Sequence, residues 1–192
     1  DGVAARRDTA LKRVCLTGAE STGKSTFAPR LAADFGGIVV PEYGRSYAET
    51  HGTRFTPQDL HRIADGHLAA RLAAEADRPR LIVEDTDIVV TAAWAEMLFG
   101  DRDPVLEGIP ATADLYLLFS PEVPWVEDGT RLFGTPDRRM RFHALIHQGL
   151  ERRGIRPVGI AGTWQERSAA ADAAVARLVG TFTPLPSDCA RE

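Results

Sequence analysis

Short apolar runs alternate with stretches of helical periodicity along the chain. Each run is mostly apolar over its whole length, as expected of strands buried on both faces. The runs are Arg13–Thr17, Ile38–Val40, Leu81–Asp85, Leu115–Phe119 and Pro157–Ala161. Strands that alternate with helices are typical of βαβ units. The pattern predicts an α/β fold, with a doubly wound five-stranded parallel sheet and helices on both faces.

Helix starts are marked in several of the intervening segments. Apolar stripes at helical spacing follow Thr56–Pro57, Thr135–Pro136 and the capping box Thr163-x-x-Glu166. A further helix is predicted to begin at Lys24. It contains Pro29, which lacks a backbone donor and is expected to bend the helix.

Three connections are longer than a compact α/β domain needs, namely Pro41–Phe55, Gly100–Ala113 and Ser120–Thr135. Each lies next to a predicted strand, and ligands of parallel sheets bind beyond the carboxyl ends of the strands. We therefore predict that these connections act as lids. We expect a single domain over residues 1–192, with a core at about 13–180 and flexible termini at 1–12 and 181–192.

Composition limits the classes of partner. The 192 residues are 44% hydrophobic and carry a formal charge of −4, with no basic run longer than a pair. Nucleic acid and anionic membranes are therefore not expected as partners. No stretch has 18 apolar residues, and Asp1–Arg13 is charged where a secretory signal is apolar. Cys15 and Cys189 have no CxxC companion. We expect a cytoplasmic protein.

One motif carries specific chemistry. The pattern G-x-x-x-x-G-K-[ST] is matched by Gly18-Ala19-Glu20-Ser21-Thr22-Gly23-Lys24-Ser25, directly after a predicted strand and before a predicted helix. In such a phosphate loop, backbone N–H groups surround phosphate oxygens, the lysine reaches the β and γ phosphates, and the hydroxyl binds Mg²⁺. ATP and Mg²⁺ are thus expected, and the nucleotide contacts are assigned to Gly18, Glu20, Ser21, Thr22, Gly23, Lys24, Ser25 and Thr26.

Some phosphate-loop classes do not fit. A guanine-reading [NT]-K-x-D element needs a lysine, and neither of the two lysines, Lys12 and Lys24, lies in one. A Ras-like GTPase is therefore disfavoured. A compact kinase for a small molecule fits best, and the rival is a regulatory ATPase that acts through a protein partner.

Carboxylates follow two of the predicted strands. Asp85 is the expected Mg²⁺ ligand together with Ser25, while Thr86 or Asp87 has the alternative role of a helix N-cap. Glu42 is the expected acceptor of a hydroxyl proton, and Arg45 is expected to contact phosphate. The alternative for Glu42 and Arg45 is a surface ion pair.

The segment after the fourth strand suits a lid that closes over phosphate. It holds an aromatic, a carboxylate and clustered arginines, which are Trp125, Asp128, Arg131, Arg138 and Arg139. Arginines that contact the transferring phosphoryl group neutralise its charge and exclude water. The alternative is that these are solvated charges at the start of a helix.

Four segments together resemble the ribosylnicotinamide kinase domain of NadR-type proteins. They are Gly18–Thr26, Glu42-Tyr43-Gly44-Arg45, Asp85-Thr86-Asp87 and Pro124-Trp125-Val126-x-Asp128-Gly129-x-Arg131, within residues 13 to about 179. The resemblance implies a P-loop kinase fold, ATP, Mg²⁺, and phosphorylation of the 5′-hydroxyl of nicotinamide riboside to give nicotinamide mononucleotide.

The expected substrate contacts lie in these segments, with Trp94 in addition. We assign them to Glu42, Tyr43, Arg45, Asp87, Trp94, Trp125 and Asp128. The family carries an aromatic residue before Glu-Tyr-Gly-Arg, where this chain has Pro41, so Tyr43, Trp94 or Trp125 is expected to stack on the ring instead. A kinase of another nucleoside-like molecule is the alternative, and the sequence does not indicate an oligomeric state.

Overall fold

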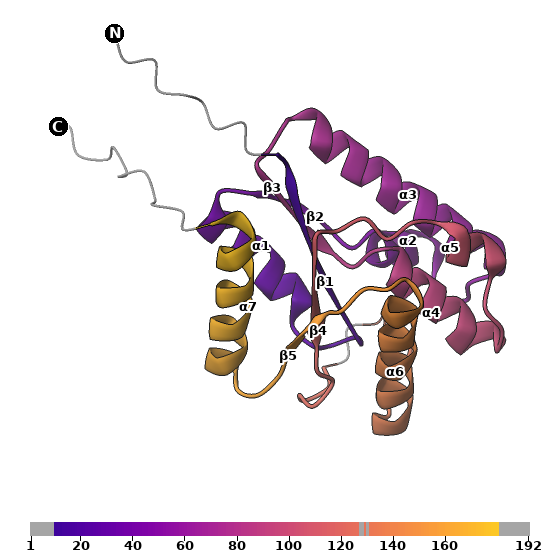
Figure 1. Ribbon diagram of the computed structural model, residues 1–192. Helices are drawn as coiled ribbons and strands as arrows, with labels where there is room; N and C mark the ends of the chain where they lie inside the picture. Colours follow the sequence, from indigo (N-terminus) through magenta and orange to yellow (C-terminus); the bar gives the residue numbers. More distant parts are fainter. Residues whose placement is uncertain (1–9, 127–128, 130, 181–192) are drawn as a thin grey trace, which may run out of the picture.

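The computed structural model describes residues 10–126, 129 and 131–180 (Figure 1). Five parallel strands form one sheet in the order β2-β3-β1-β4-β5. They are β1 (Lys12–Gly18), β2 (Ile38–Val40), β3 (Leu81–Asp85), β4 (Leu115–Phe119) and β5 (Val158–Ile160). The predicted five-stranded parallel sheet is confirmed. Lys12, which was expected in a flexible terminus, belongs to β1, and residues 1–9 and 181–192 lie outside the described ranges.

The order of the strands explains where a ligand would bind. From β1 the chain passes to the edge strand β2 and returns to β3, next to β1; it then adds β4 and β5 on the other side of β1. In the register, Leu16 lies beside Asp85, and Gly18 lies beside Phe119. The carboxyl ends of three neighbouring strands therefore meet where the strand order reverses, which is where open α/β sheets bind ligands.

Helices cover both faces of the sheet (Figure 1). Those in the described ranges are α1 (Lys24–Phe35), α2 (Tyr43–His51), α3 (Pro57–Ala76), α4 (Ile88–Phe99), α5 (Pro104–Gly108), α6 (Pro136–Arg152) and α7 (Trp164–Val179). Val14 and Leu16 of β1 pack with α1 and α7, whereas Cys15 packs with the helices on the other face. This alternation along one strand produces the two separate cores of a doubly wound fold.

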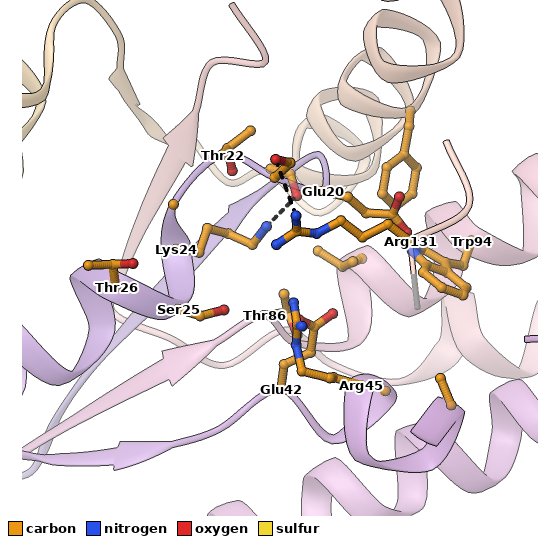
Figure 2. A pocket seen from close by; sticks show the side chains of 17 residues that line it. Glu20, Thr22, Lys24, Ser25, Thr26, Glu42, Arg45, Thr86, Trp94 and Arg131 are labelled. Atoms are coloured by element: carbon orange, nitrogen blue, oxygen red, sulfur yellow. Dashed lines mark hydrogen bonds and ion pairs between the residues drawn. The ribbon is translucent and has the colours of Figure 1, made fainter. Parts of the chain in front are cut away.

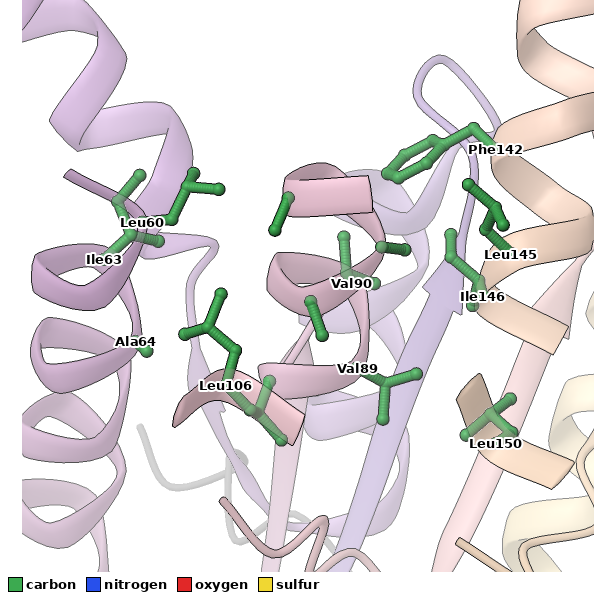
Figure 3. Close-up of a cluster of buried hydrophobic side chains, with 14 of the residues drawn as sticks. Leu60, Ile63, Ala64, Val89, Val90, Leu106, Phe142, Leu145, Ile146 and Leu150 are labelled. Atoms are coloured by element: carbon green, nitrogen blue, oxygen red, sulfur yellow. The ribbon is translucent and has the colours of Figure 1, made fainter. Parts of the chain in front are cut away.

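The larger core is centred on α4, which lies between α3 and α6 (Figure 3). Figure 3 shows Leu60 and Ile63 of α3 on one side of Val90, and Phe142 and Ile146 of α6 on the other. Seven of the first eight residues of α4 are buried. A helix that is apolar on all sides is expected to be enclosed in this way. Burial fixes the amino end of α4 close to the carboxyl end of β3.

Helix caps largely follow the sequence prediction. Thr163 and Glu166 form the predicted capping box of α7, and Thr56 forms a second one with Asp59 at α3. Thr135 precedes α6 without a capping hydrogen bond from its side chain. Helix α1 continues through Pro29 to Phe35.

Two of the three long connections are not open loops. Residues 41–55 contain α2, and residues 100–113 contain α5, which begins with Asp103 accepting the N–H groups of Val105 and Leu106. Each helix is too short to show a sustained apolar stripe. Only the connection 120–135 has no helix or strand among its described residues. In the described part of the chain, no helix is long and apolar enough to cross a membrane.

Candidate active site

The phosphate loop leaves β1 at Gly18 and enters α1 after Gly23. Gly18 has φ 136°, and a Cβ there would lie 2.6 Å from the carbonyl oxygen of Phe119. Gly23 has φ 89° and precedes α1 without any capping side chain. A side chain at Gly18 would therefore displace β4. Because Gly23 has no side chain, no side-chain acceptor occupies the N–H groups at the amino end of α1. This arrangement suits an anion.

A lysine in a loop is expected to be exposed, but Lys24 is buried. Its Nζ donates to the carbonyl oxygens of Gly18 at 3.0 Å and Ala19 at 2.9 Å, and its residue is 7% exposed. An ammonium has three donors. Lys24 can therefore brace the loop and still offer a proton to a phosphate oxygen.

An open cavity of about 680 Å³ lies in front of the loop (Figure 2). It is lined by residues of the phosphate loop, by Glu42 and Arg45 at the start of α2, and by Thr86, Trp94 and Arg131. Figure 2 shows the Arg131 side chain pointing toward Lys24, with Glu42 and Arg45 nearby.

Glu42 lines this cavity, and its surroundings shift the pKa of its carboxyl group. Burial first, and then the negative charge of Asp85, raise its pKa to about 7, while Lys24 and Arg45 act in the opposite direction. Glu42 precedes α2 but makes no capping hydrogen bond. Its Oε2 lies 3.8 Å from Arg45 Nε, so the pair expected as an alternative does exist. It is a loose contact, and the carboxylate can accept a proton near neutral pH.

Asp85 ends β3 with a buried carboxylate. The residue is 3% exposed, and its Oδ1 has no hydrogen-bond partner among the described residues. The next residue, Thr86, has φ 71°, and its N–H donates to the Leu16 carbonyl at 2.9 Å. A buried, unsatisfied carboxylate oxygen fits Mg²⁺, which binds through one or two protein oxygens, waters and phosphates. The hydroxyl of Ser25, which lines the cavity, would complete the protein's share.

A second cavity of about 380 Å³, here called the inner cavity, adjoins the first. Glu42, Thr86 and Trp94 line both cavities, and the inner one is otherwise mainly apolar. Tyr43 forms part of its wall, with the ring packed so closely on α3 that a Cβ at Gly66 would lie 2.2 Å from it. Two of the three predicted ring-stacking residues, Tyr43 and Trp94, are thereby placed at this inner cavity.

Asp87 contributes a buried carboxylate to the inner cavity and also begins α4. Its Oδ1 accepts the Val89 N–H at 2.9 Å, and its Oδ2 accepts the Tyr116 hydroxyl at 2.6 Å. The N-cap role is therefore taken by Asp87, one of the two candidates named from the sequence. Burial first raises the pKa of Asp87, and the charge of Glu84 adds to the effect. Negative charge here would be relieved by a cation.

Glu20 and Ser21 hold the connection 120–135 against the phosphate loop, which the sequence did not reveal. The Glu20 Oε2 accepts the N–H groups of Leu132 and Phe133, both at 3.0 Å. The Ser21 Oγ accepts the Val126 N–H at 2.9 Å. Burial raises the pKa of Glu20, although these backbone hydrogen bonds oppose the rise. Glu20 and Ser21, which occupy positions that the phosphate-loop motif leaves unspecified, therefore attach the loop to the predicted lid.

The three lid arginines have different surroundings. Arg131 lines the cavity, and its Nη1 contacts Ser21 Oγ at 3.4 Å and the Val126 carbonyl. Arg139 is buried, and its Nη1 donates to the Val123 carbonyl at 2.7 Å. Arg138 lies over the Phe133 ring at 5.0 Å. Arg131 is thus the one of the three that the structure places beside the phosphate loop.

Trp125 does not line either of the two cavities. Arg131 and Arg139 lie over its ring at 5.9 and 5.6 Å. The ring also packs on Gly134, where a Cβ would meet it at 3.1 Å. Asp128, which was assigned to the substrate, lies outside the described residues.

Sequence reasoning also passed over Arg167 of α7. Its Nη2 donates to the carbonyl oxygen of Thr22 in the phosphate loop, and the residue is 4% exposed. Its place in an amphipathic helix resembles that of a surface arginine, so only its contact across 145 residues identifies it.

Comparisons with known proteins identify the family of the chain. A family model described as an AAA domain matches residues 13–167. The Trifunctional NAD biosynthesis/regulator protein NadR of Escherichia coli (strain K12) is 32% identical over 151 residues, which are 76% of this chain and 37% of the relative. The protein of the same description from Salmonella typhimurium matches with the same identity and coverage. The chain therefore spans little more than a third of these curated relatives.

Solved structures share the fold. A crystal structure of a NadR protein in complex with NR matches with a TM-score of 0.79 and 24% identity, covering 92% of this chain and 54% of that one. A thymidylate kinase from Ehrlichia chaffeensis has a TM-score of 0.56 and 11% identity, covering 88% of this chain and 98% of that one. The P-loop kinase-like fold expected from the sequence is thus confirmed. The chain belongs to the family described as the AAA domain and is a relative of the NadR proteins.

Proposed function

We propose that the chain phosphorylates the 5′-hydroxyl of nicotinamide riboside, using ATP with Mg²⁺ and producing nicotinamide mononucleotide. The observation that carries this proposal is the position of Glu42 at the junction of two cavities. On one side lies the phosphate loop with Lys24, and on the other lies the mainly apolar inner cavity. A hydroxyl held by a ligand of the inner cavity would meet both a proton acceptor and a phosphate donor there.

The residues in front of the loop divide the work of phosphoryl transfer. Glu42, with a pKa of about 7, accepts the proton of the attacking hydroxyl as the new P–O bond forms. Lys24 and Arg131 neutralise charge on the phosphate oxygens, and the segment 120–135 excludes water. Ser25 and Asp85 would hold Mg²⁺, which supplies charge compensation for the β and γ phosphates when it is bound.

Charge in the inner cavity favours a cationic ring over a neutral base. Asp87 is buried there, and burial raises its pKa, so the site disfavours its own negative charge until a cation approaches. The pyridinium ring of nicotinamide riboside carries such a charge. Tyr43 and Trp94 supply aromatic surface on which a cationic ring stacks well. The similarity to NadR proteins, one of them solved with NR, supports the same acceptor.

A structure with an ATP analogue and nicotinamide riboside tests this assignment directly. We expect the riboside 5′-oxygen within hydrogen-bonding distance of the Glu42 carboxylate and the pyridinium ring beside Tyr43 or Trp94. A riboside bound elsewhere, or ring density in the inner cavity only with a neutral nucleoside, would contradict it. The alternatives are a kinase of another nucleoside-like molecule and a regulatory ATPase that acts through a protein partner.

A further inference from the structure

Arg167 is a buried cation directly behind the phosphate loop. The loop's Thr22 carbonyl accepts a hydrogen bond from its Nη2, and a Cβ at Gly23 would lie 3.9 Å from the same atom. The guanidinium lies over the rings of Phe27 at 5.6 Å and Phe119 at 5.2 Å. Within the described residues it forms no ion pair, and its Nε has no hydrogen-bond partner.

Arg30 provides a comparison, because its guanidinium lies over the same ring. It lies over Phe27 at 5.3 Å but pairs with Asp34 and with Asp172, both at 2.8 Å. Its side chain is 30% exposed, whereas the Arg167 residue is 4% exposed. A cation that is buried without a carboxylate is unfavourable, and burial accordingly lowers the pKa of Arg167. Two carboxylates compensate the charge of Arg30, whereas no carboxylate among the described residues pairs with Arg167.

The peptide that Arg167 contacts also has a donor group, which lies on the opposite side of the loop. A trans peptide is planar, and its C=O and N–H groups point in opposite directions. Because Arg167 binds the Thr22 carbonyl, the N–H of Gly23 in the same peptide must point away from Arg167. That N–H lies in the loop that lines the phosphate cavity. A hydrogen bond to the carbonyl also polarises the peptide and strengthens the N–H as a donor.

We infer that Arg167 is a positioning residue for the polyphosphate of the nucleotide, acting through the Thr22–Gly23 peptide and through its own charge. Lys24 braces the loop from within, through the carbonyls of Gly18 and Ala19, and Arg167 braces it from behind. Bound phosphates would supply the negative charge that Arg167 lacks. This inference rests on the nucleotide-binding half of the proposed function and not on the identity of the acceptor.

The affinity for nucleotides, measured without an acceptor present, tests the role inferred for Arg167. We compare wild type with Arg167→Met, Arg167→Gln and Arg167→Lys, and use Arg30→Gln as the matched control. Neutral variants at 167 should weaken binding of ATP and of inorganic tripolyphosphate by about tenfold, as expected for a charge-assisted contact. Arg167→Lys should lose less affinity than the neutral variants, since it retains the charge and a donor although it does not stack on the rings as a guanidinium does. AMP affinity should change by less than about twofold in every variant, because AMP lacks the β and γ phosphates.

The salt dependence and the control separate positioning from packing. The affinity of Arg167→Met for tripolyphosphate should depend less on salt than that of wild type, and Arg30→Gln should bind ATP as wild type does. Should Arg167→Gln not fold, Arg167→Met retains an unbranched apolar chain between the two rings and decides the question. Equal ATP affinity of folded Arg167→Met and wild type, or an equal loss for AMP and ATP, would overturn the inference. If wild type itself binds no ATP, the proposed function fails first.

Discussion

The Glu20 carboxylate accepts the backbone N–H of Phe133 at 3.0 Å, so a side chain of the phosphate loop holds a segment 113 residues further along the chain. The same oxygen accepts the N–H of Leu132. Movement of Leu132 and Phe133 away from the loop that is proposed to bind ATP must therefore break these hydrogen bonds. This links the position of Arg131 to the conformation of the phosphate loop.

Replacing Glu20 should release this segment. In Glu20→Ala the N–H groups of Leu132 and Phe133 lose their acceptor, and their amide hydrogen exchange should become about tenfold faster. Turnover should fall by a similar factor. Glu122→Ala is the control, because Glu122 is an exposed carboxylate of the same segment that contacts only Ser120 among its described hydrogen bonds. Unchanged exchange at Leu132 and Phe133 in Glu20→Ala would show that other contacts hold the segment.

Lys24 is expected to be essential for turnover but not for folding. Lys24→Ala should reduce kcat by about two to three orders of magnitude, as removal of a charge-stabilising donor does. Circular dichroism should show a native fold, because the lost contacts lie within one loop. Lys12→Ala, which changes the other lysine, should keep wild-type turnover. A folded Lys24→Ala protein with near wild-type kcat would exclude phosphate chemistry at this loop.

The pH dependence should report Glu42. With its pKa at about 7, the base is protonated at lower pH, so kcat/KM for ATP should rise as pH increases through about 7. Glu42→Gln should lower kcat and abolish this limb. Asp85→Asn should move the midpoint to lower pH, because the Asp85 charge raises the Glu42 pKa, and should also increase the Mg²⁺ concentration for half-maximal rate.

The pH dependence of protein stability tests the raised pKa of Glu42 independently of activity. The folded state keeps a proton that the unfolded state loses between pH 4.5 and about 7, so wild-type stability should decrease as pH rises through this window. Glu42→Gln removes the contribution. Its Tm should exceed that of wild type at pH 8 by about 2–4 °C for each kcal/mol gained, and the difference should disappear at pH 4. An equal Tm difference at both pH values would contradict the assigned pKa.

Asp87 should distinguish a cationic acceptor from a neutral one. Asp87→Asn keeps an N-cap and a partner for Tyr116 but removes the charge. It should lower kcat/KM for nicotinamide riboside by about tenfold, as expected for loss of one desolvated charge contact, and change that for cytidine by much less. Asp103→Asn alters another N-cap, at α5, and should leave both values unchanged. An equal loss for both acceptors in Asp87→Asn would make its role structural.

The sequence predicted what local patterns can encode. The strands were found because buried parallel strands are continuous apolar runs, and the phosphate loop because Gly18, Gly23 and Lys24 have fixed spacing. Helices α2 and α5 were missed because nine and five residues give no sustained stripe. The contacts of Glu20 and Arg167 join residues more than a hundred positions apart, and such contacts follow from the packing of the sheet.

The most direct test of the proposed function is the rate of ADP release with and without nicotinamide riboside, combined with mass analysis of the product. A kinase closes on its acceptor and excludes water, so ADP release should be slow with ATP alone. It should rise with nicotinamide riboside and match the formation of mononucleotide, with thymidine, cytidine, uridine and adenosine giving lower kcat/KM. Preference for a neutral nucleoside would contradict the proposed acceptor. Equal ADP release with and without every riboside would contradict the kinase itself and favour a regulatory ATPase.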